Sequence, residues 1–140
     1  MLFVISVALN YTWELAQAPL FVGMESFAAM WWHCFVASLG DGIILLFLHG
    51  LGWATFKRWN WSFKPGIRQI TFMLITSLGI AILIEWLAVH GLHRWAYADH
   101  MPRIPMLDVG MTPILQMLIL PPLIFFLTHK FLPPNKVDTL

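Results

Sequence analysis

The chain has 140 residues, of which 59% are hydrophobic and 11% are charged; its net charge is +1 and its mean hydropathy is +0.75. Such a composition provides too little polar surface to coat a soluble globule of this size, so it indicates an integral membrane protein. The chain has no long run of Lys or Arg, which excludes a surface that tracks nucleic acid. Its one cysteine, Cys34, excludes an internal disulfide.

Four apolar segments divide the chain, at about 2–22, 29–49, 70–91 and 111–132. A helix of about 20 residues covers roughly 30 Å, which is the thickness of the hydrocarbon layer. Helices also satisfy their own backbone hydrogen bonds in lipid, whereas isolated strands do not. The sequence therefore predicts an all-α, polytopic membrane protein, with residues 1–140 forming a single domain that is a four-transmembrane-helix bundle.

The first segment carries a polar stripe. Asn10, Glu14 and Gln17 follow i, i+4, i+7 spacing, so a helix places them on one face. Because lipid offers these groups no hydrogen-bond partners, we expect the stripe to face the other helices.

The second segment places two titratable groups on one face, since His33 and Asp41 are eight residues apart. Gly40 and Gly42 flank Asp41, and Ser38 lies one turn earlier. Small residues in a membrane helix allow another helix to approach closely. We expect close helix packing around Asp41.

The third segment contributes Glu85, and a loop of about 93–110 follows it. Pro102 and Pro105 favour a folded lid in this loop over a flexible tether. Arg94, nine residues after Glu85, is expected to swing toward that carboxylate and offset its charge, or to anchor the loop at the interface.

The fourth segment contains Gln116 and the pair Pro121-Pro122. Two prolines in succession remove two backbone donors from the middle of a helix. The sequence therefore predicts a kinked last helix.

Basic residues predict the orientation. Lys57, Arg58, Lys64 and Arg68 lie between the second and third segments, and the tail carries Lys130 and Lys136. Positive residues favour the cytoplasmic side, so both termini are expected in the cytoplasm of a bacterium and loop 93–110 outside its inner membrane. Tryptophans are expected to anchor both interfaces, at one side Trp53, Trp59 and Trp61 and at the other Trp31, Trp32, Trp86 and Trp95.

Three acids, Glu14, Asp41 and Glu85, lie inside the apolar segments without a Lys or Arg to neutralise them. A charge near the bilayer centre costs about 3 kcal/mol even on lenient scales. Depth counting places Glu14, Glu85 and Gln116 in the outer half of the membrane. It places His33 close to the outer surface and Asp41 near the midplane, so all four segments contribute polar groups to one region. Glu14 and Glu85 are the candidate catalytic acids, and the candidate ligand-binding residues are Asn10, Gln17, His33, Asp41, Arg94 and Gln116. The alternative role for the amides is hydrogen bonding between helices.

Metal chemistry remains an open possibility at this stage. Glu14, His33 and Glu85 would form an acceptable ligand set for zinc or iron. A haem between His33 and His90 would require matching depths that the sequence does not fix. No Glu-x-x-His or His-Glu-x-x-His motif supports either site. Metal and cofactor thus stay unidentified.

Two resemblances follow from longer motifs. The chain resembles a group of short bacterial four-helix integral membrane proteins of unknown function through Asn10-x-x-Trp13-Glu14-x-x-Gln17-x-Pro19-Leu20, Gly91-x-x-Arg94-Trp95-x-Tyr97 and Thr112-Pro113-x-x-Gln116. The stretch from Glu85 to Gln116 is also similar to membrane lycopene cyclase domains and related carotenoid enzymes, in which an acid precedes a glycine-aromatic turn and a Pro-x-Glu-Glu element. Here that element is Pro113-Ile114-Leu115-Gln116. The resemblance implies proton-initiated chemistry on an isoprenoid, with Glu14 or Glu85 as the acid.

Two classes of function are compatible with these features. In the first, the polar residues line a cavity that binds or acts on a lipid-like or isoprenoid molecule or a cation. In the second, the chain is a non-catalytic accessory subunit of a larger membrane complex of respiratory or photosynthetic type, packed against partner membrane subunits. A cavity joining the carboxylates would favour the first class, and a filled interior the second. Whether the protein is an enzyme stays open.

Overall fold

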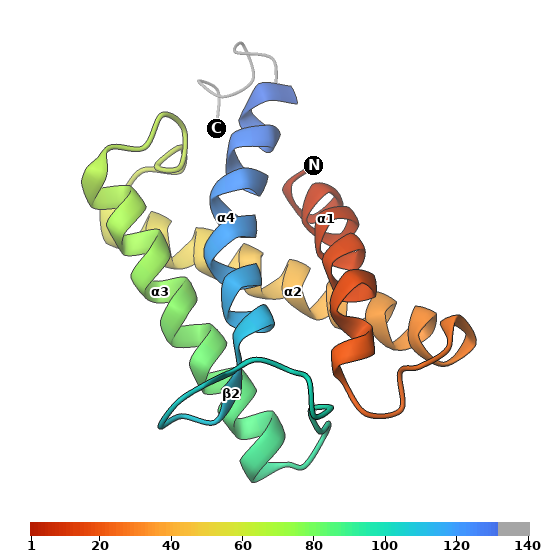
Figure 1. Ribbon diagram of the computed structural model, residues 1–140. Helices are drawn as coiled ribbons and strands as arrows, with labels where there is room; N and C mark the ends of the chain where they lie inside the picture. Colours follow the sequence, from red (N-terminus) through yellow and green to blue (C-terminus); the bar gives the residue numbers. More distant parts are fainter. Residues whose placement is uncertain (132–140) are drawn as a thin grey trace.

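The computed structural model describes residues 1–131, and within them the chain is mostly helical (Figure 1). The α-helices are α1 (Leu2–Gln17), α2 (Phe27–Phe56), α3 (Ile67–Trp86) and α4 (Met111–Phe131). Shorter elements are the 3-10 turn η1 (Ala18–Leu20), the π-helix η2 (Leu87–Gly91) and the antiparallel strands β1 (Arg103–Ile104) and β2 (Val109–Gly110). Leu132 and Lys136, used in the predictions above, lie outside the described residues.

Three helices are long and apolar enough to cross a membrane: α2, α3 together with η2, and α4. This confirms the helical class and the membrane-protein character that the composition predicts. α1 has only 16 residues, which is fewer than the predicted first span.

The helix ends differ from the predicted ones for local reasons. α1 stops five residues early because Pro19 has no N–H with which to continue the helical hydrogen bonds, and the chain passes into the 3-10 turn η1. α2 has 30 residues, beginning after Ser26, whose side chain accepts a hydrogen bond from the Ala29 N–H. It continues past His49 until Lys57, which adopts a left-handed conformation with φ 55°.

The helices do not all run side by side. α1, α3 and α4 lie roughly along one direction, and α2 crosses behind α1 and α4 at a steep angle (Figure 1). α2 and α3 meet at the loop 57–66 and diverge from there. A Cβ on Gly42 would lie 2.7 Å from the Phe3 ring, so a glycine at this position allows α1 to pack closely against α2.

The main apolar core lies at the end of the molecule where α2 meets loop 57–66. Trp61 is at its centre, only 2% exposed, and its indole N–H donates to the His49 carbonyl at 3.0 Å. The core also contains Leu45, Leu48, Met73, Leu120, Ile124 and Phe125. The prediction that Trp61 is an interfacial anchor is wrong, because the loop folds it back between the helices. A Cβ on Gly52 would come within 2.1 Å of the Trp61 ring, and this close approach requires glycine.

At the opposite end, two connections form a folded cap, defined here as residues 18–22 and 94–110. Phe21 pairs with Tyr97 in an isolated antiparallel bridge. The flanking backbone bonds are Val22 N–H to Ala96 C=O at 3.0 Å and Ala98 N–H to Leu20 C=O at 2.9 Å. The loop predicted at 93–110 is therefore ordered by backbone pairing with the end of the first segment.

Candidate functional site

Gln116 of α4 is the centre of a buried hydrogen-bond network that joins three helices. Its side-chain nitrogen donates to Asn10 Oδ1 at 2.8 Å and to Asp41 Oδ2 at 3.0 Å. Its side-chain oxygen accepts from Gln17 Nε2 at 3.1 Å. α1, α2 and α4 are thereby tied together through one amide, and Gln116 is only 3% exposed.

The α1 stripe completes the network. Gln17 Nε2 also donates to Glu14 Oε1 at 3.0 Å, and Trp13 Nε1 donates to Gln17 Oε1 at 3.2 Å. Asn10 Nδ2 donates to the backbone carbonyl and the hydroxyl of Ser6. Both side-chain N–H groups of Asn10, of Gln17 and of Gln116 therefore donate hydrogen bonds. Such complete pairing removes most of the cost of burying polar groups.

Glu85 of α3 makes its own interaction, with the cap. The Tyr97 hydroxyl donates a hydrogen bond to Glu85 Oε2. Burial, and then this bond to Glu85, raise the pKa of Tyr97 above its ordinary value, so the phenol stays protonated and keeps donating. The Tyr97 ring packs on Gly110, where a Cβ would lie 2.9 Å from it.

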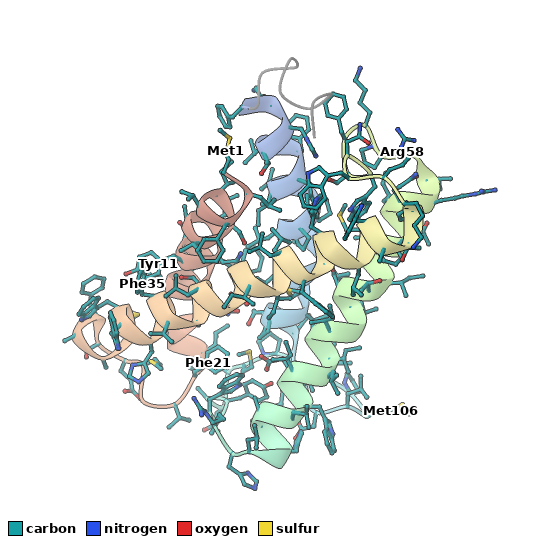
Figure 2. The ribbon with its side chains drawn as sticks, turned by 180° about the vertical axis from the view of Figure 1, so that it is seen from behind. Met1, Tyr11, Phe21, Phe35, Arg58 and Met106 are labelled. Carbon is teal, nitrogen blue, oxygen red and sulfur yellow. The ribbon has the colours of Figure 1, made fainter. Side chains whose placement is uncertain are left out.

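A cavity of about 580 Å³ connects these groups. Glu14, Asp41 and Glu85 all line it, from three different helices. The remaining lining is mainly apolar and comes from α1, α2, the cap, the end of α3 and the start of α4; it includes Ala18, Phe21, Trp32, Ala37, Ile44, Ala81, Ile84, Trp95 and Met117. In Figure 2 the labelled Phe21 side chain lies in the space between the first half of α2 and the last turns of α3. This volume falls within the range of small-molecule sites.

Gly40 contributes to the cavity by its lack of a side chain. A Cβ built on it meets no heavy atom within 4 Å, although the residue lies on the cavity wall beside Asp41. The glycine on the other side of Asp41, Gly42, packs against α1 instead. The two glycines therefore serve different purposes: one allows helix contact and the other leaves space.

The predicted site residues mostly converge. Asn10, Gln17, Asp41 and Gln116 are joined by the network, and Glu14 is bonded to it through Gln17. Glu85 borders the same cavity without bonding to this network.

His33 does not join the other predicted residues in a metal site. Its side chain is exposed, and Nδ1 pairs with the Ala29 carbonyl at 2.8 Å, within its own helix. Residues 1–131 contain no group of three or more His, Cys, Asp or Glu residues placed to hold a metal ion. The suggested ligand set of Glu14, His33 and Glu85 is therefore wrong, because His33 lies at the cavity rim and bonds locally.

Arg94 does not neutralise Glu85. The ion pair found within the described residues joins Arg103 and Asp108, at 3.2 Å on the surface. Arg94 is exposed at the edge of the cavity, where its guanidinium keeps its hydration, and burying that hydrated group would be costly. Glu85 therefore contacts the neutral hydroxyl of Tyr97 and not the predicted cation, Arg94.

Sequence reasoning missed Tyr97 and Trp13 as members of the site. Trp13 lies one turn before Gln17, and this i, i+4 spacing could have suggested its bond to the amide. Tyr97 depends on the fold of the cap, which no local pattern shows.

Searches of protein-family models, curated proteins and solved structures find no match to this chain. The geometry of the site is therefore the basis for its function.

Proposed function

We propose that the protein is a bacterial inner-membrane protein that holds a lipid-like or isoprenoid molecule in the carboxyl-lined cavity. The observation that carries this proposal is the cavity itself: about 580 Å³, mainly apolar, with Glu14, Asp41 and Glu85 on its wall. Pockets for small apolar ligands combine an apolar wall with a few convergent polar groups in the same way.

The membrane arrangement belongs to the same proposal. α1 covers about 24 Å at 1.5 Å per residue, and with η1 it would make a fourth, short span. Pro121 and Pro122 lie inside α4 and would bend it where two backbone donors are missing. Both termini would face the cytoplasm and the cap would face outward, since the basic residues gather in loop 57–66.

A ligand would enter from the lipid, between α2 and α3. Val36 of α2 is 49% exposed and Ile84 of α3 is 37% exposed, and both line the cavity. Because α2 and α3 diverge from loop 57–66, this side is covered by lipid rather than by another helix of the chain. The cap restricts the other approach, from outside the membrane.

The carboxyl groups would form hydrogen bonds with the polar part of the ligand. The hydrogen bonds within residues 1–131 use Oε1 of Glu14 and Oδ2 of Asp41, and neither Glu14 Oε2 nor Asp41 Oδ1 takes part in one of them. These oxygens can accept from a ligand, or donate to it when protonated. A protonated Glu14 or Glu85 would also have the chemistry of a general acid toward a bound isoprenoid.

The accessory-subunit function receives less support. A subunit that only packs on partners is expected to fill its interior, whereas a cavity joins the acids here. The exposed apolar side chains on the helices are accounted for by lipid.

The test is to identify what copurifies in mild detergent, by organic extraction and mass spectrometry. Gly40→Leu should fill the cavity without a clash, because its Cβ meets open space, and the copurifying molecule should fall at least tenfold. Gly79→Leu is the matched control, since Gly79 is an exposed glycine of α3 with equally open surroundings, and it should retain the molecule. Equal retention by both variants would overturn the proposal.

A further inference from the structure

We infer that the ligand carries a positively charged amine, which the carboxyl groups of Glu14 and Asp41 recognise, on an apolar body. This inference rests on the function proposed above and specifies the chemical class of the ligand. It follows from the charges, the shape and the aromatic residues of the cavity taken together.

The ionisable groups around the cavity are unbalanced. Three carboxyl groups line it, and the basic groups that reach it are His33 and Arg94. Both basic side chains are exposed at the rim, and within residues 1–131 neither pairs with an acid of the cavity. The interior is thus rich in acids and has no basic group. A ligand cation would let the carboxyl groups ionise, whereas a neutral ligand would leave them to hold their protons.

An inorganic cation fits the site less well than an organic amine does. Residues 1–131 assemble no group of three metal-binding side chains, and Glu85 is engaged by Tyr97 away from the Gln116 network. The apolar wall would also give a bare ion no ligands in place of its water shell. A cation that brings its own hydrocarbon surface, as an amine with an alkyl body does, matches the wall and the acids at once.

Aromatic side chains strengthen the match with an organic ammonium group. Phe21, Trp32 and Trp95 contribute to the lining. Alkylammonium groups are attracted to aromatic faces, and this attraction grows when water is excluded.

The position of the head group follows from the oxygen atoms that are not in use. Glu14 Oε2 and Asp41 Oδ1 have no hydrogen bond within the described residues, and both parent side chains bond to adjoining amides, Gln17 and Gln116. Glu85, in contrast, already accepts a hydrogen bond from the Tyr97 hydroxyl. The amine would therefore sit on the α1–α2 side, and its hydrocarbon would extend along Ile84 and Met117.

The experiment compares two probes with the full chain in nanodiscs of phosphatidylcholine. One is dodecylammonium, and the other is tridecane, the neutral hydrocarbon in which a methyl group replaces the ammonium head. Native mass spectrometry measures the bound fraction at equal mole fraction in the bilayer. The ammonium probe is expected to bind at least tenfold more tightly. Glu14→Gln with Asp41→Asn should abolish this preference while the melting temperature and the binding of the neutral probe are maintained.

Glu25→Gln is the matched control, because Glu25 is an exposed acid outside the cavity lining, and it should keep the full preference. If both probes bind equally well and Gly40→Leu blocks the binding of both, the inferred positive charge of the ligand is contradicted. The proposed cavity function would still stand. A preference that survives the double substitution would also overturn the inference. Failure of both probes to bind would contradict the proposed function as well as the inference.

Discussion

The helices are held together differently at the two ends of this molecule. At the end near loop 57–66, α2, α3 and α4 close around Trp61 with an apolar core. At the cap end, α2 has diverged from α3, and a cavity lined by acids lies beside a smaller apolar cluster of Ala81, Val109, Ile114 and Met117. The comparison indicates that apolar packing supports the first end, and that a hydrogen-bond network adds to a smaller apolar cluster at the other.

The polar groups at the two ends differ as well. In the cap-end network, every side-chain N–H group of Asn10, Gln17 and Gln116 has an acceptor. At the Trp61 end, His129 pairs with Ser62 at 3.0 Å, but the buried atoms His49 Nδ1, Thr128 Oγ1 and His129 Nδ1 have no partner within residues 1–131. The amide N–H groups beside the cavity are therefore better satisfied than these buried atoms, which is consistent with a network that keeps an open site in shape.

The largest effect is expected from Trp61→Ala. Removing a fully buried indole from the apolar core should lower the free energy of unfolding by about 3–5 kcal/mol, while the protein that remains folded keeps its copurifying ligand. Trp59→Ala, at an indole that is 50% exposed, should cost far less. Reversible unfolding in mixed micelles measures both. Loss of ligand in folded Trp61→Ala would show that the two ends are not separate.

Gln116→Ala should have the next largest effect, about 2–4 kcal/mol, because Asp41, Asn10 and Gln17 each lose a hydrogen-bond partner. Leu115→Ala is a suitable neighbour for comparison, since Leu115 is 40% exposed. The same unfolding assay applies. A smaller loss for Gln116→Ala than for Leu115→Ala would mean that the network does not support the cap end.

The acids are expected to separate binding from stability. Glu14→Gln and Glu85→Gln keep side-chain size and most hydrogen bonds while removing the charge, so the unfolding free energy should change by less than about 1 kcal/mol. Ligand retention should fall strongly for Glu14→Gln and less for Glu85→Gln, whose carboxylate is engaged by Tyr97. If both variants instead melted markedly lower and bound normally, the acids would be structural groups.

The effect expected at Tyr97 is confined to stability, and it depends on pH. Tyr97→Phe should cost about 1 kcal/mol near neutral pH through loss of the bond to Glu85. Since the folded-state pKa of Tyr97 is raised above the unfolded value of about 10, its stabilisation is complete below pH 10 and is lost as the pH rises beyond it. The wild type and Tyr97→Phe should therefore converge in melting temperature above pH 10. A constant difference up to pH 11 would contradict this assignment.

The parts of this structure that the sequence predicts are those with local signals. Hydropathy predicts the apolar helices, and the spacing of Asn10, Glu14 and Gln17 predicts one polar face. The length and crossing of α2 are not predictable in this way, because Gly50 and Gly52 allow a helix to continue as well as to end. Trp61 and Tyr97 owe their positions to loops folded back on the bundle, and their sequence neighbours give no indication of that.

A structure determined in a lipid bilayer tests the central claim most directly. We predict that α2 crosses the other helices and diverges from α3, and that non-protein density lies in the cavity within hydrogen-bond distance of Glu14 or Asp41. A bundle in which α2 closes against α3 along its length, with side chains filling the space and Glu14 facing lipid, would contradict it.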